Sequence, residues 1–252
     1  MIYKFFSCPT GPETVSRLCQ ILEKNTLWAA SPNTFNDPFE CKIALDLTAS
    51  EEERRARYKK DNPSATEENF QSWNSGLDQA KWHVEQNTRS GILQTYGISC
   101  FTREWENELL WAHYAKDHTG FCIGFEECTL LQWDQLTGAG DVEYRDDVYP
   151  FRFFHDSLPE FAKRTIFTKS SRWAYEQEYR LVFEGSGVKV MPPGAIVEVT
   201  IGCRASHELR QELQNMQVSG GLALYQASEM LNRYRLTREV IKKGHWSMTS
   251  HF

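Results

Sequence analysis

The residues best suited to chemistry in this sequence are two glutamates, Glu176 and Glu178, which stand two positions apart just before Arg180. Their surroundings predict the start of a strand, in which alternate side chains point to one face of the sheet. Two carboxylates held close together cannot both ionise freely, so such a pair can supply an acid, a base or a hydrogen-bond acceptor. The alternative interpretation is two solvated acids, one of them in a salt bridge with Arg180 or Lys169.

Two histidines, His113 and His118, lie near the end of an expected helix over residues 107–116. Five positions turn a helix so that the two side chains point about 140° apart, whereas a zinc-binding pair four positions apart stays on one face. We therefore expect no metal site. The alternative to a ligand contact for His118 is a hydrogen-bonded packing residue. If His118 lies beyond the helix end, Gly120 is placed to let a ligand approach the backbone.

The segment 35–40 places Asn36, Asp37 and Pro38 between two phenylalanines. Asn and Asp side chains close loops by accepting hydrogen bonds from nearby backbone N–H groups, and this role needs no substrate. Asn36 and Asp37 become candidates for substrate binding only if another motif lies beside them in the folded chain.

Composition and cysteine usage limit the partners and the compartment. The formal net charge is −6, so no broad positive field favours bulk nucleic-acid binding. Seven cysteines without a CxxC pair indicate a reduced, cytoplasmic protein. The first residues lack the apolar core of a secretory signal, and no apolar run reaches the roughly 18 residues of a membrane span. We therefore expect a mature cytoplasmic protein with no membrane partner.

Several common catalytic motifs are missing from the sequence. It contains no GxSxG, P-loop, GxGxxG or kinase signature, which removes the usual support for acyl transfer and for P-loop phosphoryl transfer. Cys100 and Cys122 fall within expected strands, where a buried and inert thiol is the favoured interpretation. Aromatic residues make up 13% of the chain, and many of them flank the polar motifs. We expect their rings to wall a cleft.

The elements that must position these residues are expected to form one α+β domain over residues 1–252. Strands cluster after residue 95 without a regular βαβ alternation, which favours a mixed or antiparallel β core flanked by helices over a doubly wound parallel sheet. The expected strands cover residues 27–30, 96–102, 120–126, 142–145, 179–184, 195–201, 222–226 and 234–239. The expected helices cover residues 13–24, 107–116, 159–168 and 206–216, the first of them opened by a capping box from Thr10 to Glu13.

Residues 50–90 differ in composition from the rest of the chain and predict a helical insertion within this domain. Residues 51–60 are dense in charge, and residues 63–67 open a second segment with the character of a helix cap. Phe70, Trp73 and Leu77 follow near helical spacing and form one apolar stripe. The plain interpretation is a helical subdomain folded over the sheet, and the alternative is a lid or a partner-binding arm.

The order of these motifs resembles a widespread, mostly bacterial family known as domain of unknown function 2971. The resemblance spans nearly the whole chain. It rests on Tyr3-Lys4-Phe5, Leu27-Trp28, the segment 35–40, Ile98-Ser99-Cys100-Phe101-Thr102, Leu110-Trp111-Ala112-His113-Tyr114, the segment 118–125, Lys169, the segment 173–180 and Ile201-Gly202. Residues 50–87 fall between matching segments and look like an insertion of this chain.

The layout of that family is similar to ADP-ribosyltransferases, and the similarity implies an NAD-dependent enzyme that acts on an unknown target, a protein or a nucleotide. In such enzymes an early strand supplies a polar residue that contacts NAD, a middle strand a Ser or an aromatic residue, and a late strand the Glu that grips the nicotinamide ribose. The resemblance implies Glu178 as the catalytic acceptor and Glu176 as the residue that orients the target nucleophile. It implies a cofactor-binding set of Tyr3, Lys4, Ser99, Thr102, Trp111, Tyr114 and His118, and a substrate-binding set of Asn36, Asp37 and Arg180.

The sequence departs from the pattern of those enzymes at two places. Lys4 stands where they usually carry His or Arg on the first strand, and their Ser-Thr-Ser strand is reduced here to residues 99–102. These departures imply an altered ligand or lost catalysis. Two alternatives therefore stay open: a non-catalytic module that binds a nucleotide or a protein in the same aromatic cleft, and a metal-independent hydrolase with Glu178 as its base.

Overall fold

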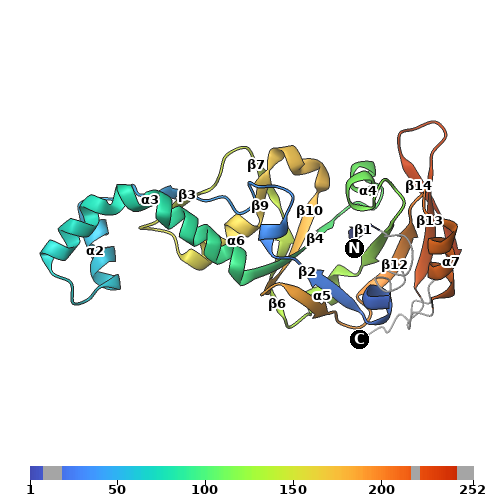
Figure 1. Ribbon diagram of the computed structural model, residues 1–252, viewed down its shortest axis with the longest axis horizontal. Coiled ribbons are helices and arrows are strands. Elements are labelled where there is room, and N and C mark those ends of the chain that lie inside the picture. The colour runs from blue at the N-terminus through green and yellow to red at the C-terminus, as the bar shows by residue number, and fades with distance from the viewer. Residues whose placement is uncertain (8–18, 217–221, 243–252) are drawn as a thin grey trace, which may run out of the picture. The chain divides into compact units, whose positions relative to one another are not determined.

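The computed structural model describes residues 1–7, 19–216 and 222–242, and the chain divides into two compact units (Figure 1). Unit 1 consists of Met1–Ala30, Gly97–Asp141 and Ala174–Phe252, and unit 2 consists of Ser31–Tyr96 and Val142–Trp173. The chain therefore passes twice from unit 1 into unit 2 and back. That both units fold as one domain, as the sequence predicts, stays a prediction.

Unit 1 is built on an eight-stranded sheet with the order β14-β13-β12-β5-β1-β4-β10-β6. Its strands are β1 (Ile2–Phe6), β4 (Tyr96–Thr102), β5 (Phe121–Phe125), β6 (Leu136–Asp141), β10 (Glu178–Glu184), β12 (Ile196–Ile201), β13 (Ala223–Glu229) and β14 (Leu236–Lys242). Strands β12 and β13 run parallel, whereas β1 is antiparallel to both of its neighbours. The expected α+β class, with a mixed β core flanked by helices, is confirmed.

One face of this sheet, which we call the core face, carries the main apolar core of unit 1. Alternate strand residues share a face, and the core face includes Ile2, Phe6, Phe101, Ile123, Tyr179 and Leu181. Three helices pack on this core, each through at least one leucine: η1 (Cys19–Glu23), α5 (Glu127–Leu131) and α7 (His207–Asn215). Burial of this apolar surface is the main force that holds the sheet together.

The opposite face, which we call the polar face, has a smaller apolar cluster under helix α4 (Glu108–Tyr114). Leu110 and Trp111 of this helix pack on Phe5 and Cys122 of the sheet. Outside the large sheet, β2 (Thr26–Ala29) pairs with β11 (Gly187–Val190), and the 3-10 helix η3 (Ser171–Glu176) precedes β10. Helix α4 and the end of η3 are the elements that position the expected catalytic residues.

Unit 2 contains two small parallel strand pairs. Strand β3 (Ala44–Asp46) pairs with β8 (Pro150–Arg152), and β7 (Glu143–Arg145) pairs with β9 (Thr168–Ser170). Helix α6 (Leu158–Ile166) connects the two pairs, and the short helix η2 (Pro32–Thr34) opens the unit. The ring of Phe151 stacks on Phe161 with centroids 4.4 Å apart, which packs α6 against β8.

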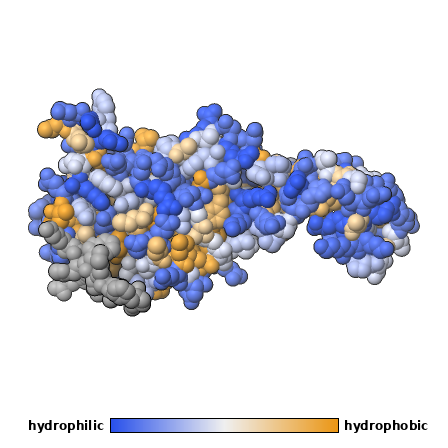
Figure 2. Space-filling model, turned by 180° about the vertical axis from the view of Figure 1, so that it is seen from behind, coloured by the Kyte–Doolittle hydropathy of each residue, from blue (hydrophilic) through white to orange (hydrophobic). Residues whose placement is uncertain are grey.

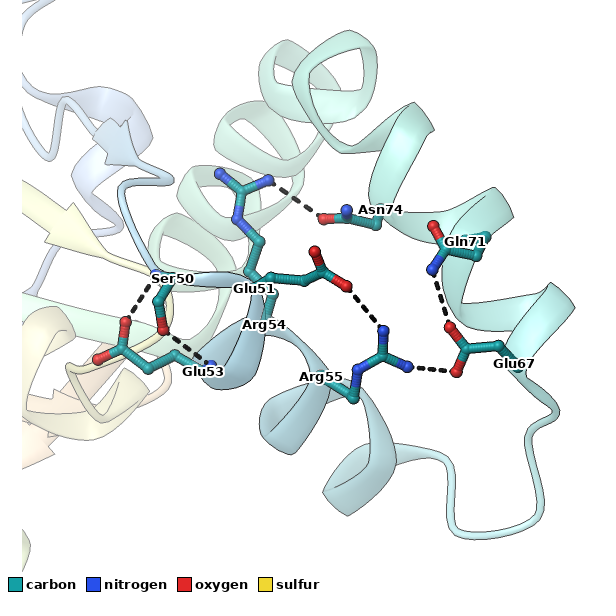
Figure 3. A network of polar contacts seen from close by, with 8 residues as sticks. All are labelled: Ser50, Glu51, Glu53, Arg54, Arg55, Glu67, Gln71 and Asn74. Atoms are coloured by element: carbon teal, nitrogen blue, oxygen red, sulfur yellow. Dashed lines mark hydrogen bonds and ion pairs between the residues drawn. The ribbon is translucent and has the colours of Figure 1, made fainter.

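A helical hairpin of α2 (Glu51–Asp61) and α3 (Glu67–Thr95) completes unit 2 (Figure 1). Ser50 and Thr66 each close a capping box at the start of a helix, and Thr66 lies within the segment 63–67 that was expected to cap a helix. Charged side chains join the two helices, because Arg55 bonds to Glu51 on its own helix and to Glu67 on the next (Figure 3). The surface over the hairpin is mostly hydrophilic (Figure 2).

Aromatic rings form the apolar side of this hairpin. Tyr58 of α2 lies 4.9 Å from the ring of Trp73 on α3, and Trp73 meets Phe154 near β8 at 6.2 Å. The expected insertion at residues 50–90 is helical, but α3 continues to Thr95 and buries Ile92 and Leu93. The end of this helix is therefore part of the core of unit 2.

Most elements expected from the sequence are present, and the differences concern short ones. The expected strands and the helices over 107–116, 159–168 and 206–216 are found within a few residues. The residue pattern did not predict β1, β3, β6, β8, β9, β11 and α5, all of which have three to six residues and too little periodicity to stand out. The expected helix over 13–24 and its capping box from Thr10 to Glu13 lie largely outside the described residues.

Candidate functional site

The strand register places four of the expected residues on the polar face of unit 1. Tyr3 pairs with Thr102 across β1 and β4, so these two side chains share a face. Phe101 and Tyr179 belong to the core face. Because successive residues of a strand point to opposite faces, Thr102, Glu178 and Arg180 point to the polar face. The polar face therefore carries Tyr3, Thr102, Glu178 and Arg180.

Glu178, the first residue of β10, is held by a two-bond ion pair with Arg180. Arg180 donates from Nε to Oε1 at 2.7 Å and from Nη2 to Oε2 at 3.1 Å. Glu178 is 3% exposed and Arg180 is 0% exposed. A fork-to-fork pair of this kind keeps a carboxylate charged and fixes its orientation. The salt bridge to Arg180 that the alternative interpretation named is thus present, and the pair is buried. A contact of Arg180 with a substrate stays a prediction.

Glu176 does not lie on β10, so the expectation that strand alternation aligns it with Glu178 is wrong. It ends η3, and Gln177, with a left-handed φ of 43°, stands between it and the strand. The Tyr114 hydroxyl donates a 2.7 Å hydrogen bond to Glu176 Oε1, and Glu176 is only 5% exposed. Tyr114 on α4 therefore contacts Glu176, whereas the guanidinium of Arg180 pairs with Glu178.

Asn107 is a positioning residue that the sequence analysis missed. Its Oδ1 accepts from the N–H groups of Leu109 and Leu110 at 3.2 Å, which caps α4. Its Nδ2 donates to the carbonyl of Tyr175 at 2.6 Å. One side chain thus starts the helix and ties it to the chain next to Glu176. The signal in the sequence is an Asn at the start of the expected helix over residues 107–116.

Helix α4 brings aromatic rings to the polar face. Trp111 is fully buried, donates from Nε1 to the carbonyl of Trp105 at 2.7 Å, and meets the ring of Phe5 edge-on at 5.0 Å. Tyr3, Tyr114 and Tyr175 pack beside this cluster. Trp111 serves packing in this conformation, and both the expected cleft of aromatic rings and the contact of Trp111 with a cofactor stay predictions.

His118 follows α4 in a left-handed conformation with φ 66°. Its ring lies parallel to Trp111 at 6.2 Å, and its Nδ1 is buried without a hydrogen-bond partner among the described residues. Burial, and secondly the charge of Arg204, lower the pKa of His118. A Cβ on Gly120 would lie 2.0 Å from the carbonyl oxygen of Phe6. The close approach that Gly120 permits is therefore to the chain itself and not to a ligand.

Lys4 and Ser99 belong to the other side of the sheet by strand alternation with Tyr3 and Thr102. Lys4 Nζ donates to the carbonyl of Cys100 at 2.8 Å and lies 5.4 Å from the centroid of the Phe101 ring. Ser99 is 1% exposed, and its hydroxyl donates to the carbonyl of Trp28 at 2.6 Å. The structure therefore divides the expected cofactor-binding set between two faces.

The thiols of Cys100 and Cys122 are not activated. Burial raises the pKa of each thiol well above its usual range, and the Glu178 carboxylate raises the pKa of Cys100 further. A thiol that stays protonated at neutral pH is a poor nucleophile. The expectation of inert strand cysteines agrees with these surroundings.

A second carboxylate–guanidinium pair lies on the polar face and was not expected from the sequence. Arg238 of β14 donates from Nη1 to Glu198 Oε1 at 2.5 Å and to Thr200 Oγ1 at 2.9 Å. Its guanidinium lies 4.5 Å from the ring centroid of Trp105 and 4.2 Å from that of Tyr225. Only the fold joins these residues, which lie on β12, β13, β14 and the loop after β4. The signal in the sequence is a single Glu in the otherwise apolar strand 196–201.

Asn36 and Asp37 belong to unit 2, whereas Glu178 belongs to unit 1. Asp37 is 7% exposed, and its Oδ1 accepts from the N–H of Phe39 at 2.9 Å. This is the loop-closing bond of an Asx turn. The structural interpretation of segment 35–40 is therefore confirmed for Asp37, and the substrate role of both residues stays a prediction.

The segment 35–40 does meet a second motif inside unit 2. Lys169 Nζ lies 3.6 Å from Glu40 Oε1 and 4.9 Å from the ring centroid of Trp173. The side chains of Lys169 and Glu40 are 8% and 2% exposed. Arg89 of α3 donates to the carbonyls of Pro38 and Glu40 at 2.9 Å. A buried ion pair thus joins segment 35–40 to Lys169, which lies far away in the sequence. Helix α3 holds the same segment through Arg89.

Neither a cluster of metal ligands nor a membrane-spanning helix is present in the described part of the chain. No three His, Cys, Asp or Glu side chains gather there as the ligands of a metal ion would. None of its helices combines the length and the apolar character that a membrane span requires.

Comparison with known proteins finds one match. Residues 110–181 match a family described as protein of unknown function (DUF2971). No curated protein and no solved structure matches the chain. The matched span runs from α4 to the first residues of β10, so Tyr114, Glu176, Glu178 and Arg180 lie within it. Over residues 110–181 the chain is therefore similar to the DUF2971 family of proteins of unknown function.

Proposed function

We propose that the chain is an ADP-ribosyltransferase-like enzyme that uses NAD, with Glu178 as its catalytic acceptor. The observation that carries the proposal is the Glu178 carboxylate, oriented by two bonds from Arg180 on the same face as Tyr3 and Thr102. A fixed anion at the start of a late strand is the feature that the resemblance to ADP-ribosyltransferases requires.

The residues on this face suit a nucleotide with a ribose. NAD would supply a ribosyl group whose bond to nicotinamide breaks as positive charge develops on the sugar. Glu178 would accept a hydrogen bond from a ribose hydroxyl and stabilise that charge, which is stronger binding to the transition state than to the substrate. Glu176, held by Tyr114, would orient the nucleophile of the target. The rings of Tyr3 and Tyr114 offer apolar walls beside these carboxylates.

The burial of Glu178 favours a second candidate, a non-catalytic module that binds a nucleotide or a protein on the same face. A carboxylate that is 3% exposed and already paired is reached only after a local opening of the face. In a module of this kind the pair of Glu178 and Arg180 would serve stability alone. We place either function in the reducing cytoplasm, because Cys41, Cys100, Cys122, Cys128 and Cys203 are free thiols.

The test measures NAD binding and NAD cleavage by the full chain. Calorimetry with NAD up to millimolar concentration should show binding, and chromatography should show release of nicotinamide. Glu178→Gln should abolish that release while the variant stays folded. Glu184→Gln, at the exposed end of the same strand, is the matched control and should keep the release.

Three outcomes separate the candidates. Absence of any NAD binding would contradict the cofactor assignment. Binding without nicotinamide release, and with an affinity that Glu178→Gln leaves unchanged, would support the module and contradict the enzyme. Release of nicotinamide that Glu178→Gln does not reduce would contradict the catalytic role of Glu178.

A further inference from the structure

Unit 2 contains a cavity that is lined by its own residues. Its volume is about 250 Å³, and its walls come from the chain before β3, the connection between β7 and β8, helix α6 and strand β9. Pockets for drug-sized ligands span roughly 300–1,000 Å³, so this one suits a smaller molecule. Every lining residue belongs to unit 2, and none belongs to the residues expected to hold NAD.

Three cationic side chains line this cavity: Lys42, Arg145 and Lys169. The side chain of Lys169 is 8% exposed, so its charge is fixed deep in the wall. Lys42 is exposed, and its ammonium lies 5.2 Å from the ring centroid of Phe39. Within the described ranges, no carboxylate lies close enough to Lys42 to form an ion pair. A positive charge at the cavity is therefore available to a ligand.

Arg145 supplies a donor that the protein leaves unused. Its Nη1 donates to Glu143 Oε1 at 2.9 Å, and its guanidinium lies 4.9 Å from the ring centroid of Tyr149. Its Nε is buried and has no hydrogen-bond partner in the described part of the chain. A buried donor without an acceptor costs free energy that an anionic ligand would recover. The arginine fork is also the geometry that binds phosphate oxygens best.

The remaining polar groups of the wall suit hydroxyls rather than a second anion. Asp146 accepts a hydrogen bond from Ser171, whereas the exposed carboxylate of Asp147 has no partner among the described residues. Thr168 and Ser170 add hydroxyl groups. A ligand that fits this set carries an anionic group that the cations can bind and hydroxyl donors that Asp147 can accept from.

We infer that this cavity binds the phosphate monoester of a small, hydroxyl-bearing molecule, with the phosphate at Lys42 and Arg145. Lys169 reinforces the charge, and its ion pair with Glu40 joins segment 35–40 to β9 at the cavity wall. The inference does not depend on NAD or on Glu178, because all of these residues lie in unit 2.

The test is calorimetry of the full chain with ribose 5-phosphate, ribose and inorganic phosphate. Ribose 5-phosphate should bind, inorganic phosphate should bind more weakly, and ribose should not bind. Lys42→Gln and Arg145→Gln should each weaken binding of ribose 5-phosphate about tenfold, which is the usual effect of one charged hydrogen bond. Lys60→Gln on the exposed end of α2 is the matched control and should change nothing.

The results that would overturn the inference are specific. No binding of ribose 5-phosphate, or binding that both variants leave intact, would refute it. Equal binding of ribose would refute the phosphate contact, and equal binding of inorganic phosphate would refute recognition of the hydroxyls. Because Lys42 is exposed, its variant keeps the test valid even if Arg145→Gln fails to fold. Glu178→Gln should leave the affinity for ribose 5-phosphate unchanged. A failure of the NAD proposal can therefore be told apart from a failure of this inference.

Discussion

The Tyr114 hydroxyl donates a 2.7 Å hydrogen bond to Glu176 Oε1 across 62 residues of the chain. With the bond from Asn107 to the carbonyl of Tyr175, it ties both ends of α4 to the segment that precedes β10. The position of Glu176 is therefore set by a helix and not by the strand that follows it.

Tyr114→Phe should lower the free energy of unfolding by about 1–2 kcal/mol, because it leaves a buried carboxylate without one of its donors. Urea unfolding followed by circular dichroism measures the change. Tyr234→Phe is the matched control, since Tyr234 is 100% exposed and its hydroxyl should contribute nothing. Equal stability of Tyr114→Phe and the wild type would show that the bond does not hold Glu176.

Arg180→Met should destabilise the protein by about 3–5 kcal/mol, because it leaves the charge of Glu178 buried without its guanidinium. The same urea experiment measures this loss. Adding Glu178→Gln to Arg180→Met removes the stranded charge and should recover a large part of the stability. A double variant no more stable than Arg180→Met would contradict the view that the two residues act as one pair.

The stability of the protein should fall as the pH drops below the ordinary pKa of histidine, about 6.5. Folding lowers the pKa of His118 through burial, so the unfolded chain takes up a proton first and gains stability relative to the fold. His118→Asn should make this part of the pH dependence disappear, and Asn tolerates the φ of 66°.

Thermal unfolding at several pH values between about 5 and 8 checks the contribution of His118. Lys116→Asn, at a neighbouring exposed position with a φ of 48°, is the control for the substitution itself. An unchanged pH profile in His118→Asn would show that the histidine does not couple folding to protonation.

Ser50→Ala should loosen helix α2 by about 1 kcal/mol, because the serine hydroxyl accepts from the N–H of Glu53 (Figure 3). No residue of α2 is buried, so the cap matters more than packing for this helix. Amide hydrogen exchange over residues 51–54 should accelerate about fivefold. Ser50→Thr keeps the hydroxyl and should retain the protection, whereas equal acceleration in both variants would exclude the cap as the cause.

The sequence predicted the larger elements because their signals are local. Thr66 caps α3 as its side chain allows, and the alternating residues of β5 and β10 follow the period of a strand. Segment 35–40 was correctly read as a loop, because the Asp37 side chain bonds to a backbone N–H two residues on. Each of these features depends on neighbours within a few positions.

The candidate site could be predicted only in part, because its contacts join distant residues. The spacing of Glu176 and Glu178 indicated one strand face, but a left-handed Gln177 separates a helix end from a strand start. The residues Glu198 and Arg238 lie 40 positions apart, and nothing near Glu198 in the sequence indicates Arg238 as its partner. The cavity of unit 2 could not be predicted for the same reason, because its lining residues run from Phe39 to Ser170.

The sequence by itself determined which residues could ionise, cap or pack, since residue type sets charge, hydrogen bonding and local propensity. Only the tertiary structure decided which of them meet. It placed Glu178 against Arg180, Glu176 against Tyr114, and Glu40 against Lys169, because strand register and helix packing are set by burial of the whole core. Burial also decided that these carboxylates are held by partners within the protein.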